Sequence, residues 1–369
     1  MPISSPSSVA QAFLPAAPRF VSACLCLFSL SAQPVPHPPN PFSLKLPEGN
    51  YNVTLTTTCP TSVYAESRRL MLENAPPGAH TITVNIRDSH LPAPPLNAPG
   101  GERVRLNDRE ANVLHWDDQL TLAWTVPCVQ DLTIAPVPAT VPTIFLAGDS
   151  TVTDQPKAPT TSWGQMLPRF FKPGIAIANH AESGETLKSF ITALRLDKIL
   201  SQIKKGDYLF IQFGHNDMKE NWPQTYAQAA TTYKQYLRVL IAEARLHGAT
   251  PVLITSMHRR NFGPDGRIRN TLGEYPEAVR QTAAEEKVAL IDLNAMSTLF
   301  YEALGPEKSP VAFGANGKDA THHSAYGAYE LAKCVVAGIR AAHLDLANYL
   351  VEDVPPFDPA HPDSPEAWK

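Results

Sequence analysis

The sequence predicts an α/β region built on a parallel sheet, preceded by a smaller all-β sandwich. Three observations favour this fold class. Residues 42–136 alternate apolar and polar side chains in short runs, with no helical periodicity between them. From residue 143 onward, short apolar runs alternate with helical stretches. Small polar residues follow each of these later runs, where the ligand crevice of an open parallel sheet lies.

The all-β region is expected over residues 42–138, a common size for a sandwich module. Its strands are expected in FSLKLPEGNYNVTLTTT, HTITVNIRDSH and DQLTLAWTV, which are separated by Gly, Pro and Asn-Asp clusters. We expect this region to pack against the α/β region and to shape its cleft. Independent sugar binding is the alternative, but no cluster of aromatic residues in residues 42–136 favours it.

The α/β region is expected over residues 139–348. Its strands are predicted in TIFLAGDS, IAIANHAESG, DYLFIQFGHND, TPVLITSMH and VALIDLN. Helices are predicted in DKILSQIKKG, TYAQAATTYKQYLRVLIAEARLHG, YPEAVRQTAAEEK and GAYELAKCVVAGIRAAHL, with Gly248 as the C-cap of the second.

The N-terminal segment is predicted to hold a signal peptide and a linker, and the C-terminal segment a Pro-rich tail. The apolar stretch over residues 20–32 predicts a secretory signal peptide, residues 1–32, cleaved near Ala32. It is too short to span a bilayer, so we expect a secreted or periplasmic protein. Residues 33–41 are expected to be a Pro-rich linker and residues 349–369 a Pro-rich tail.

Composition argues against two classes of partner. The chain has 369 residues, a formal net charge of -4 and a pI near 6.3. A mildly acidic chain is a poor binder of nucleic acid, and we expect no membrane association after signal cleavage. The oligomeric state is left open.

The cysteines outside the signal segment are Cys59, Cys128 and Cys334. No pair has the spacing of metal ligands, and we expect no metal site. A disulfide between Cys59 and Cys128 is one interpretation, because both lie in the all-β region. Buried free thiols are the other.

Four strand-end loops carry residues suited to acyl transfer. Ser150 follows an expected strand in Gly-Asp-Ser, and a serine becomes a nucleophile when a base takes its proton. Asp319 precedes His322 by three residues, so it could fix the tautomer of this base. His323 is an alternative base, although the spacing from Asp319 favours His322.

The two other loops suit an oxyanion hole. Asn216 follows the strand DYLFIQF, and its side-chain amide could donate to a tetrahedral oxyanion. Gly184 follows IAIANHAES and lets the backbone approach a reacting oxygen. Each motif alone is also typical of an ordinary polar turn, but their order along the chain is the order that a serine hydrolase needs.

The blocks GDSTV, NHAESGETLKSF, FGHND and DATHHSAYGA resemble those of the SGNH (GDSL-type) hydrolases, and of their rhamnogalacturonan acetylesterase branch, carbohydrate esterase family 12, in particular. The resemblance covers about residues 42–345. It implies a three-layer α/β/α fold with a five-stranded parallel sheet, and no cofactor. The sequence departs from the branch at Glu185, the position directly after Gly184, where members of the branch often have an arginine.

The resemblance also implies roles for five residues. Ser150 would be the nucleophile, and its own N–H an oxyanion donor. Gly184 would supply a second N–H and Asn216 a side-chain amide. His322 would be the general base, oriented by Asp319. The implied activity is that of a carboxylic ester hydrolase that removes O-acetyl groups from rhamnogalacturonan through an acetyl-enzyme.

A basic segment follows the strand TPVLITS and contains four arginines: Arg259, Arg260, Arg267 and Arg269. Arginine forks suit carboxylates, and rhamnogalacturonan carries one on every second sugar. We take Arg259 and Arg260 as candidate substrate contacts. A solvated basic loop, or pairing with nearby glutamates, is an equal alternative.

Two tryptophans, Trp163 and Trp222, could stack on sugar rings, and we take Trp163 as a candidate substrate contact. Packing in the core or in a loop is the more common fate of a tryptophan.

Three other functions are compatible with the sequence. Another carbohydrate acetylesterase, such as an acetylxylan esterase, would use the same residues. A GDSL lipase or thioesterase would need an apolar acyl pocket, whereas the loops around the motifs are polar and short. A non-catalytic carbohydrate-binding protein is the alternative from a different class, and the complete set of reactive residues argues against it. The partner expected for the esterase is an acetylated plant cell-wall polysaccharide.

Overall fold

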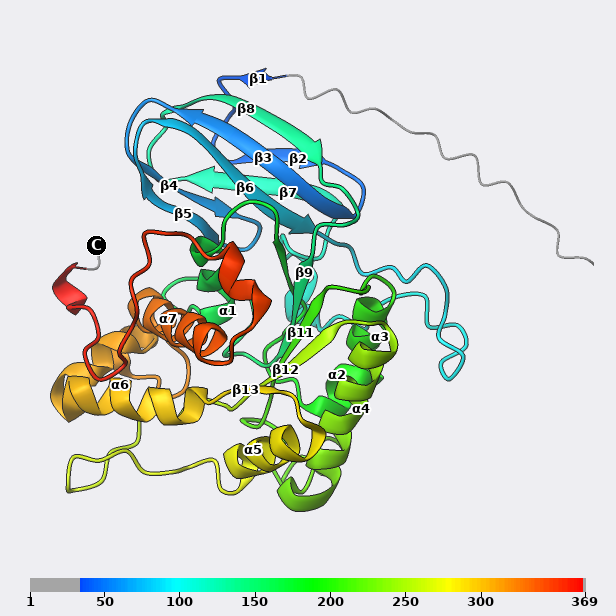
Figure 1. Ribbon diagram of the computed structural model, residues 1–369, viewed down its shortest axis with the longest axis vertical. Helices are drawn as coiled ribbons and strands as arrows, with labels where there is room; N and C mark the ends of the chain where they lie inside the picture. Colours follow the sequence, from blue (N-terminus) through cyan, green and yellow to red (C-terminus); the bar gives the residue numbers. More distant parts are fainter. Residues whose placement is uncertain (1–33, 368–369) are drawn as a thin grey trace, which may run out of the picture. The chain divides into compact units, whose positions relative to one another are not determined.

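An antiparallel part and a parallel part follow one another along the chain, as the two sequence patterns predict (Figure 1). The computed structural model describes residues 34–367. The signal peptide predicted over residues 1–32 lies outside the described residues.

Two four-stranded antiparallel sheets make up the all-β region. The first has the order β1-β8-β3-β6 and the second the order β2-β7-β4-β5. Alternate side chains of both sheets point into a shared apolar core, as in Val53 and Leu55, which are fully buried. The strands are β1 Val35–Pro36, β2 Phe42–Lys45, β3 Gly49–Thr57, β4 Thr61–Ala65, β5 Arg69–Ala75, β6 Gly78–Ile86, β7 Gln119–Trp124 and β8 Val129–Pro136.

Part of the segment predicted as a linker, residues 33–41, belongs to this sandwich. Val35 pairs with Leu132 of β8, which makes β1 an edge strand of the first sheet. A proline is tolerated in an edge strand because one side of that strand needs no hydrogen-bond donor. The high proline content of the segment therefore concealed a strand.

A disulfide joins Cys59 and Cys128, whose Cα atoms lie 5.8 Å apart. Of the two interpretations that the sequence left open, a disulfide or buried free thiols, the structure shows the disulfide for this pair. Cys334 is a free thiol, fully buried in the helix Ala325–Ala341.

The parallel sheet has the order β10-β9-β11-β12-β13. Chain order therefore reverses beside β9, and ligands of such sheets bind at this switch point, beyond the carboxyl ends of the strands. Side chains of β9 alternate between the two faces: Ile144 and Leu146 pack on one, Phe145 and Ala147 on the other. The strands are β9 Thr143–Gly148, β10 Ala176–Asn179, β11 Tyr208–Gln212, β12 Thr250–Ile254 and β13 Ala289–Ile291.

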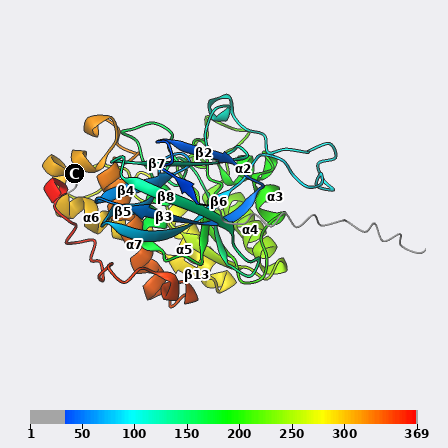
Figure 2. The ribbon, with the colours of Figure 1, turned by 90° about the horizontal axis from the view of Figure 1, so that it is seen from above.

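Helices cover both faces of the parallel sheet and make the three-layer fold (Figure 1). One face is covered by α1 Trp163–Met166, α6 Leu293–Lys308 and α7 Ala325–Ala341. The other is covered by α2 Leu187–Thr192, α3 Arg195–Leu200, α4 Lys234–Leu246 and α5 Tyr275–Glu286. Figure 2 looks from the side of the antiparallel sheets, which lie in front of these helices.

The sequence did not indicate every element. Helix α6 contains Gly305, which has non-helical dihedrals, and Pro306. Both residues interrupt the apolar periodicity by which a helix is recognised in a sequence. The predicted C-terminal tail is not free of the fold, since Lys333 of α7 forms an ion pair with Asp363, 2.7 Å long.

Candidate active site

Ser150 lies in the turn that directly follows β9. The sharp turn requires glycine at position 148, because a Cβ there would lie 2.6 Å from Val152 Cγ2 and 3.0 Å from the Gln212 carbonyl oxygen. The turn puts Ser150 beyond the carboxyl end of the sheet, where 7% of the residue is exposed.

Ser150, His322 and Asp319 form a hydrogen-bonded row. The Nε2 atom of His322 lies 2.8 Å from Ser150 Oγ, and its Nδ1 atom lies 2.7 Å from Asp319 Oδ2. The side chains of His322 and Asp319 are about one third exposed, at 33% and 29%. The structure thus brings together three residues that are 172 positions apart at their extremes, in the arrangement that lets a serine be deprotonated.

Asp319 is held in its ionised form by the backbone. Partial burial opposes ionisation, but the N–H groups of His322 and Thr321 donate to Asp319 Oδ1 and lower the pKa of this carboxyl below its usual value. A carboxylate fixed on one turn of chain orients the imidazole, whose Nδ1–H donates to its second oxygen.

His323, the alternative base, points away from Ser150. Its Nε2 atom lies 2.6 Å from the Tyr301 hydroxyl, and the ring packs against Phe313. Burial lowers the pKa of His323 to about 3. It is a neutral core residue, so the structure places His322 alone beside the serine.

The candidate oxyanion donors surround the same point of the sheet. Among residues 34–367, the N–H groups of Ser150 and Gly184 donate to no backbone acceptor. Gly184 has a φ of 83°, a conformation that favours glycine. The Asn216 amide donates one N–H to the Glu185 carbonyl, 3.0 Å away, and its oxygen accepts from Lys219, which fixes the direction of the amide.

Supporting residues that the sequence analysis did not single out lie beneath this site. Asp149 accepts from His215 Nδ1 at 3.3 Å and from the Thr151 hydroxyl at 2.8 Å. Burial opposes ionisation of Asp149, but the charge and hydrogen bond of His215 lower its pKa. The neighbouring letters of the GDS and GHND blocks were the signal that could have indicated this pair.

Asp154 and Asp217, whose roles spacing could not indicate, both hold loops. Asp154 forms a fully buried ion pair, 2.5 Å long, with Arg69 of β5, and also accepts from the Asn179 amide. Asp217 accepts from the N–H of Leu187, 2.8 Å away. Each aspartate therefore connects two of the strand-end loops.

Glu185, the position that departs from the family pattern, is buried. Its carboxylate lies 3.4 Å from the Nε of Arg195 and accepts a hydrogen bond from Ser189. Its side chain faces helices α2 and α3, so it supports the loop.

The candidate contacts Arg259 and Arg260 are largely engaged within the protein. Arg259 donates to the backbone oxygens of His215 and Thr271, each at 3.1 Å. Arg260 donates to the Gly317 oxygen at 2.5 Å. These guanidinium groups tie the basic segment to the loops around the site.

The two other arginines of the segment pair with carboxylates. Arg267 pairs with Glu302 at 2.5 Å, and Arg269 lies 3.4 Å from Asp265. The alternative of internal pairing is therefore what the structure shows, although the partners are Glu302 and Asp265 and not the glutamates that closely follow the segment in sequence.

The prediction of Trp163 as a sugar contact is wrong. Trp163 is 1% exposed and its indole N–H donates to Gln212 Oε1 at 2.8 Å, below the sheet end. Trp222 is 40% exposed, with the Lys219 ammonium 3.8 Å from its ring centroid. The sequence carried no signal that distinguished the buried indole from the exposed one.

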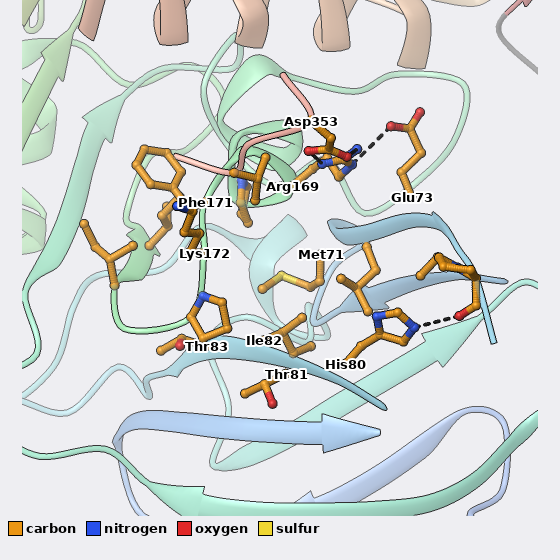
Figure 3. A pocket seen from close by; sticks show the side chains of 18 residues that line it. Met71, Glu73, His80, Thr81, Ile82, Thr83, Arg169, Phe171, Lys172 and Asp353 are labelled. Carbon is orange, nitrogen blue, oxygen red and sulfur yellow. Dashed lines mark hydrogen bonds and ion pairs between the residues drawn. The ribbon is translucent and has the colours of Figure 1, made fainter. Parts of the chain in front are cut away.

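A cavity of about 270 Å³ lies where β5 and β6 face residues 168–177 (Figure 3). Its charged groups are engaged within the protein. Arg169 pairs with Glu73 at 3.2 Å and Asp353 at 2.8 Å, and His80 Nε2 donates to a backbone oxygen. None of the residues that line it belongs to the Ser150 loop, so it is separate from the candidate site.

Within residues 34–367, no group of three or more His, Cys, Asp and Glu side chains is arranged to hold a metal ion. In the same range no helix is long and apolar enough to cross a membrane.

The chain matches a known protein family and is similar to two named relatives. The GDSL-like Lipase/Acylhydrolase family model matches residues 146–329. The chain is 44% identical over 221 residues to rhamnogalacturonan acetylesterase RhgT of Bacillus subtilis (strain 168), which covers 56% of this chain and 94% of that protein. It is 42% identical over 217 residues to the probable rhamnogalacturonan acetylesterase YesY of the same organism, covering 57% and 98%.

The crystal structure of protein YxiM from Bacillus subtilis extends the similarity to the all-β region. It is 26% identical, with a TM-score of 0.54, and covers 83% of this chain and 81% of that chain. This share exceeds the α/β region, so both regions take part in the match.

Proposed function

The chain belongs to the GDSL-like lipase/acylhydrolase family, and we propose that it removes O-acetyl groups from rhamnogalacturonan, with Ser150 as its nucleophile. As a member of this family with acetylesterase relatives, it is a carboxylic ester hydrolase. The single observation that carries the mechanism is the hydrogen-bonded row from Ser150 through His322 to Asp319.

In the first step, Ser150 Oγ attacks the acetyl carbonyl carbon while His322 Nε2 accepts its proton. Asp319 holds the Nδ1–H of the ring and stabilises the imidazolium. The C–O bond to the sugar then breaks, and the sugar oxygen takes the proton from His322. The acetyl group is left on Ser150.

The negative oxygen of each tetrahedral intermediate would be stabilised by the N–H groups of Ser150 and Gly184 and by the Asn216 amide. Each such donor contributes about 3–4 kcal/mol in enzymes where it has been removed. In the second step, water attacks the acetyl-enzyme with His322 again as base. Acetate leaves and Ser150 recovers its proton.

The names of the two relatives at 44% and 42% identity support a pectic substrate. The basic segment gives this substrate little support, because its arginines are engaged within the protein. An acetylxylan or other carbohydrate acetylesterase is the second candidate, with the same catalytic residues. A lipase is disfavoured by the polar neighbours of Ser150, which include the Gln155 amide, 2.7 Å from its carbonyl oxygen.

We propose a secreted or periplasmic location. The Cys59–Cys128 disulfide supports it, because structural disulfides persist in oxidising compartments. The signal-like sequence over residues 20–32 agrees with it. Sequencing the N-terminus of the exported protein would test this: a mature chain that starts near residue 33 is expected, and retention of residues 1–32 in the cytoplasm would contradict it.

Acetate release by the purified protein tests the function. Wild type and Ser150→Ala are compared on p-nitrophenyl acetate, acetylated rhamnogalacturonan and acetylated xylan. We expect wild type to deacetylate the pectic polymer best and Ser150→Ala to be inactive on all three. Preference for xylan would leave the mechanism standing and overturn the substrate. No release from any substrate would favour a carbohydrate-binding protein.

A further inference from the structure

A cavity of about 250 Å³ lies between the all-β region and the loops that follow β9 and β10. One wall comes from the connection between β6 and β7 and includes Arg109, Val113 and His115. In Figure 1 this connection, drawn in cyan, runs from the antiparallel sheets alongside the α/β region. The opposite wall includes Thr153 and Ser183. This volume is just below the range of roughly 300–1,000 Å³ for ligand pockets, which suits one sugar unit.

The cavity adjoins the proposed catalytic residues. Gln155, which lines it, donates from Nε2 to the Ser150 carbonyl oxygen and lies 3.4 Å from Ser183 Oγ. Ser183 precedes Gly184, a proposed oxyanion donor, and its carbonyl accepts from Arg109. A ligand in this cavity would therefore lie next to the loops of Ser150 and Gly184.

Three of the lining side chains are almost fully buried and each has a polar atom with no hydrogen-bond partner in residues 34–367: Thr153 Oγ1, His115 Nε2 and Glu110 Oε1. The other polar atoms of two of these are fixed. His115 Nδ1 lies 2.7 Å from Ser67 Oγ, and Glu110 Oε2 accepts from Arg195. Buried polar atoms without partners are costly, at about 1–3 kcal/mol each, so three of them around one cavity fit a ligand with several hydroxyl groups.

One cation that lines the cavity has no carboxylate partner among the described residues. The cavity's three carboxylates are each paired with an arginine: Glu110 with Arg195, Asp154 with Arg69, and Glu182 with Arg109. Lys157 is exposed, lines the cavity and forms no ion pair among the described residues. An acidic sugar would bring the matching charge.

We propose that this cavity is a subsite for a sugar unit of the polysaccharide near the acetylated one, a role that rests on the proposed function. The ring hydroxyls bond to Thr153, His115 and Glu110, and the carboxylate of a uronate unit pairs with Lys157. The all-β region thereby takes part in substrate recognition through the connection between β6 and β7.

The first test fills the cavity from the side of the all-β region. Val113→Trp is compared with Val126→Trp, which changes a 41%-exposed valine of the same region outside the cavity. The measured quantity is the ratio of kcat/KM on acetylated rhamnogalacturonan to kcat/KM on p-nitrophenyl acetate. We expect Val113→Trp to lower this ratio by about ten-fold or more and Val126→Trp to leave it within about two-fold. An unchanged ratio in Val113→Trp overturns the proposal.

The second test changes only charge, at an exposed position where folding is not at risk. We expect Lys157→Glu to lower the same ratio by about five-fold, the upper range for an exposed ion pair. The matched control is Lys205→Glu, which changes an exposed lysine that does not line the cavity and forms no ion pair among the described residues. Equal effects of the two variants would point to long-range charge and contradict the assignment of Lys157.

A binding measurement separates failure of the subsite from failure of the proposed function. Calorimetry with deacetylated rhamnogalacturonan oligosaccharide is done on Ser150→Ala, with and without Val113→Trp. Binding that Val113→Trp abolishes supports the subsite even if wild type releases no acetate. Absent binding, or equal binding by both proteins, overturns the subsite even if the esterase activity is confirmed.

Discussion

The α/β region and the all-β region contribute different kinds of side chain to the surroundings of Ser150. The α/β region contributes side chains from loops beside the Ser150 turn, such as His322 and Asp319, which are partly exposed and hydrogen-bonded in a row. The all-β region contributes arginines that are almost fully buried: Arg69 and Arg87 are 1% and 2% exposed.

These buried arginines contact the loops of the site and not the reacting atoms. Arg69 pairs with Asp154, four residues after Ser150, and Arg87 donates to the backbone oxygen of Asn179 at the end of β10. Burial lowers the pKa of Arg87 to about 9. The two regions therefore have different roles, and we expect catalytic rate and stability to respond to different substitutions.

The largest effect is expected at His322. Because His322 is the proposed base, His322→Ala should lower kcat on p-nitrophenyl acetate by about 10⁴–10⁶-fold. The free energy of unfolding in urea should change little, because the side chain is one third exposed. A variant that keeps kcat within about ten-fold of wild type would contradict the division of roles.

Arg69→Met should have the opposite profile. It leaves Asp154 buried without its partner, and breaking a buried pair typically costs about 3–5 kcal/mol. Urea unfolding measures the loss. The control is Lys45→Met, which breaks a pair of similar length with Asp118 at an exposed position and should not shift the unfolding midpoint measurably. Equal destabilisation by both variants would show that burial of the arginine is not what matters.

Asn216→Ala should lower kcat on p-nitrophenyl acetate by about 10²–10³-fold through loss of one oxyanion donor. Asn270→Ala is the matched control, since the Asn270 amide donates only to the Gly273 oxygen in the basic segment. If the two variants have the same kcat, the amide of Asn216 takes no part in the oxyanion hole.

Asp217 should make stability depend on pH. Burial raises the pKa of Asp217 to about 7, so the folded protein binds a proton that the unfolded chain has lost above its ordinary pKa. The stabilisation is complete below pH 4 or so and is lost as pH rises toward about 7. Asp217→Asn should flatten the fall in unfolding free energy between about pH 5 and pH 7. An unchanged slope would mean that Asp217 is ionised in the fold.

The smallest effect is expected at Arg267, a member of the basic segment that first suggested an acidic substrate. Its partner Glu302 already occupies its guanidinium, and its side chain is 72% exposed. Arg267→Gln should leave KM for acetylated rhamnogalacturonan within about two-fold. A rise of about ten-fold would restore this segment as a substrate contact.

Much of the site could be predicted because its residues follow buried strands. All five apolar runs of the α/β region are strands, so the polar residues after them had to meet at one edge of the sheet. The positions of Ser150, Gly184 and Asn216 follow from this, whereas Asp319 and His322 lie between α6 and α7, after a helix and not after a strand. His322 and His323 are adjacent in sequence, so the choice of base depended on a single position. The three-residue spacing from Asp319 favoured His322.

The contribution of the all-β region could not be predicted in the same way. Arg69, Arg87 and Arg109 are scattered in a strand pattern that gives each no separate signal, and their partners in the α/β region lie at least 73 residues away. The prediction that arginines of the basic segment contact substrate lost its support for the opposite reason. Clustering in sequence made its arginines conspicuous, but tertiary contacts decide which cations are free.

Covalent labelling with a fluorophosphonate would identify the nucleophile and its base. A fluorophosphonate reacts with a serine only when a neighbouring base activates it. Peptide mass spectrometry should find the label on Ser150 in the wild-type protein and a strong loss of labelling in His322→Ala, while His323→Phe, if folded, should still be labelled. Label on another serine, or equal labelling of Ser150 in wild type and His322→Ala, would contradict the assignment of Ser150 and His322 as nucleophile and base.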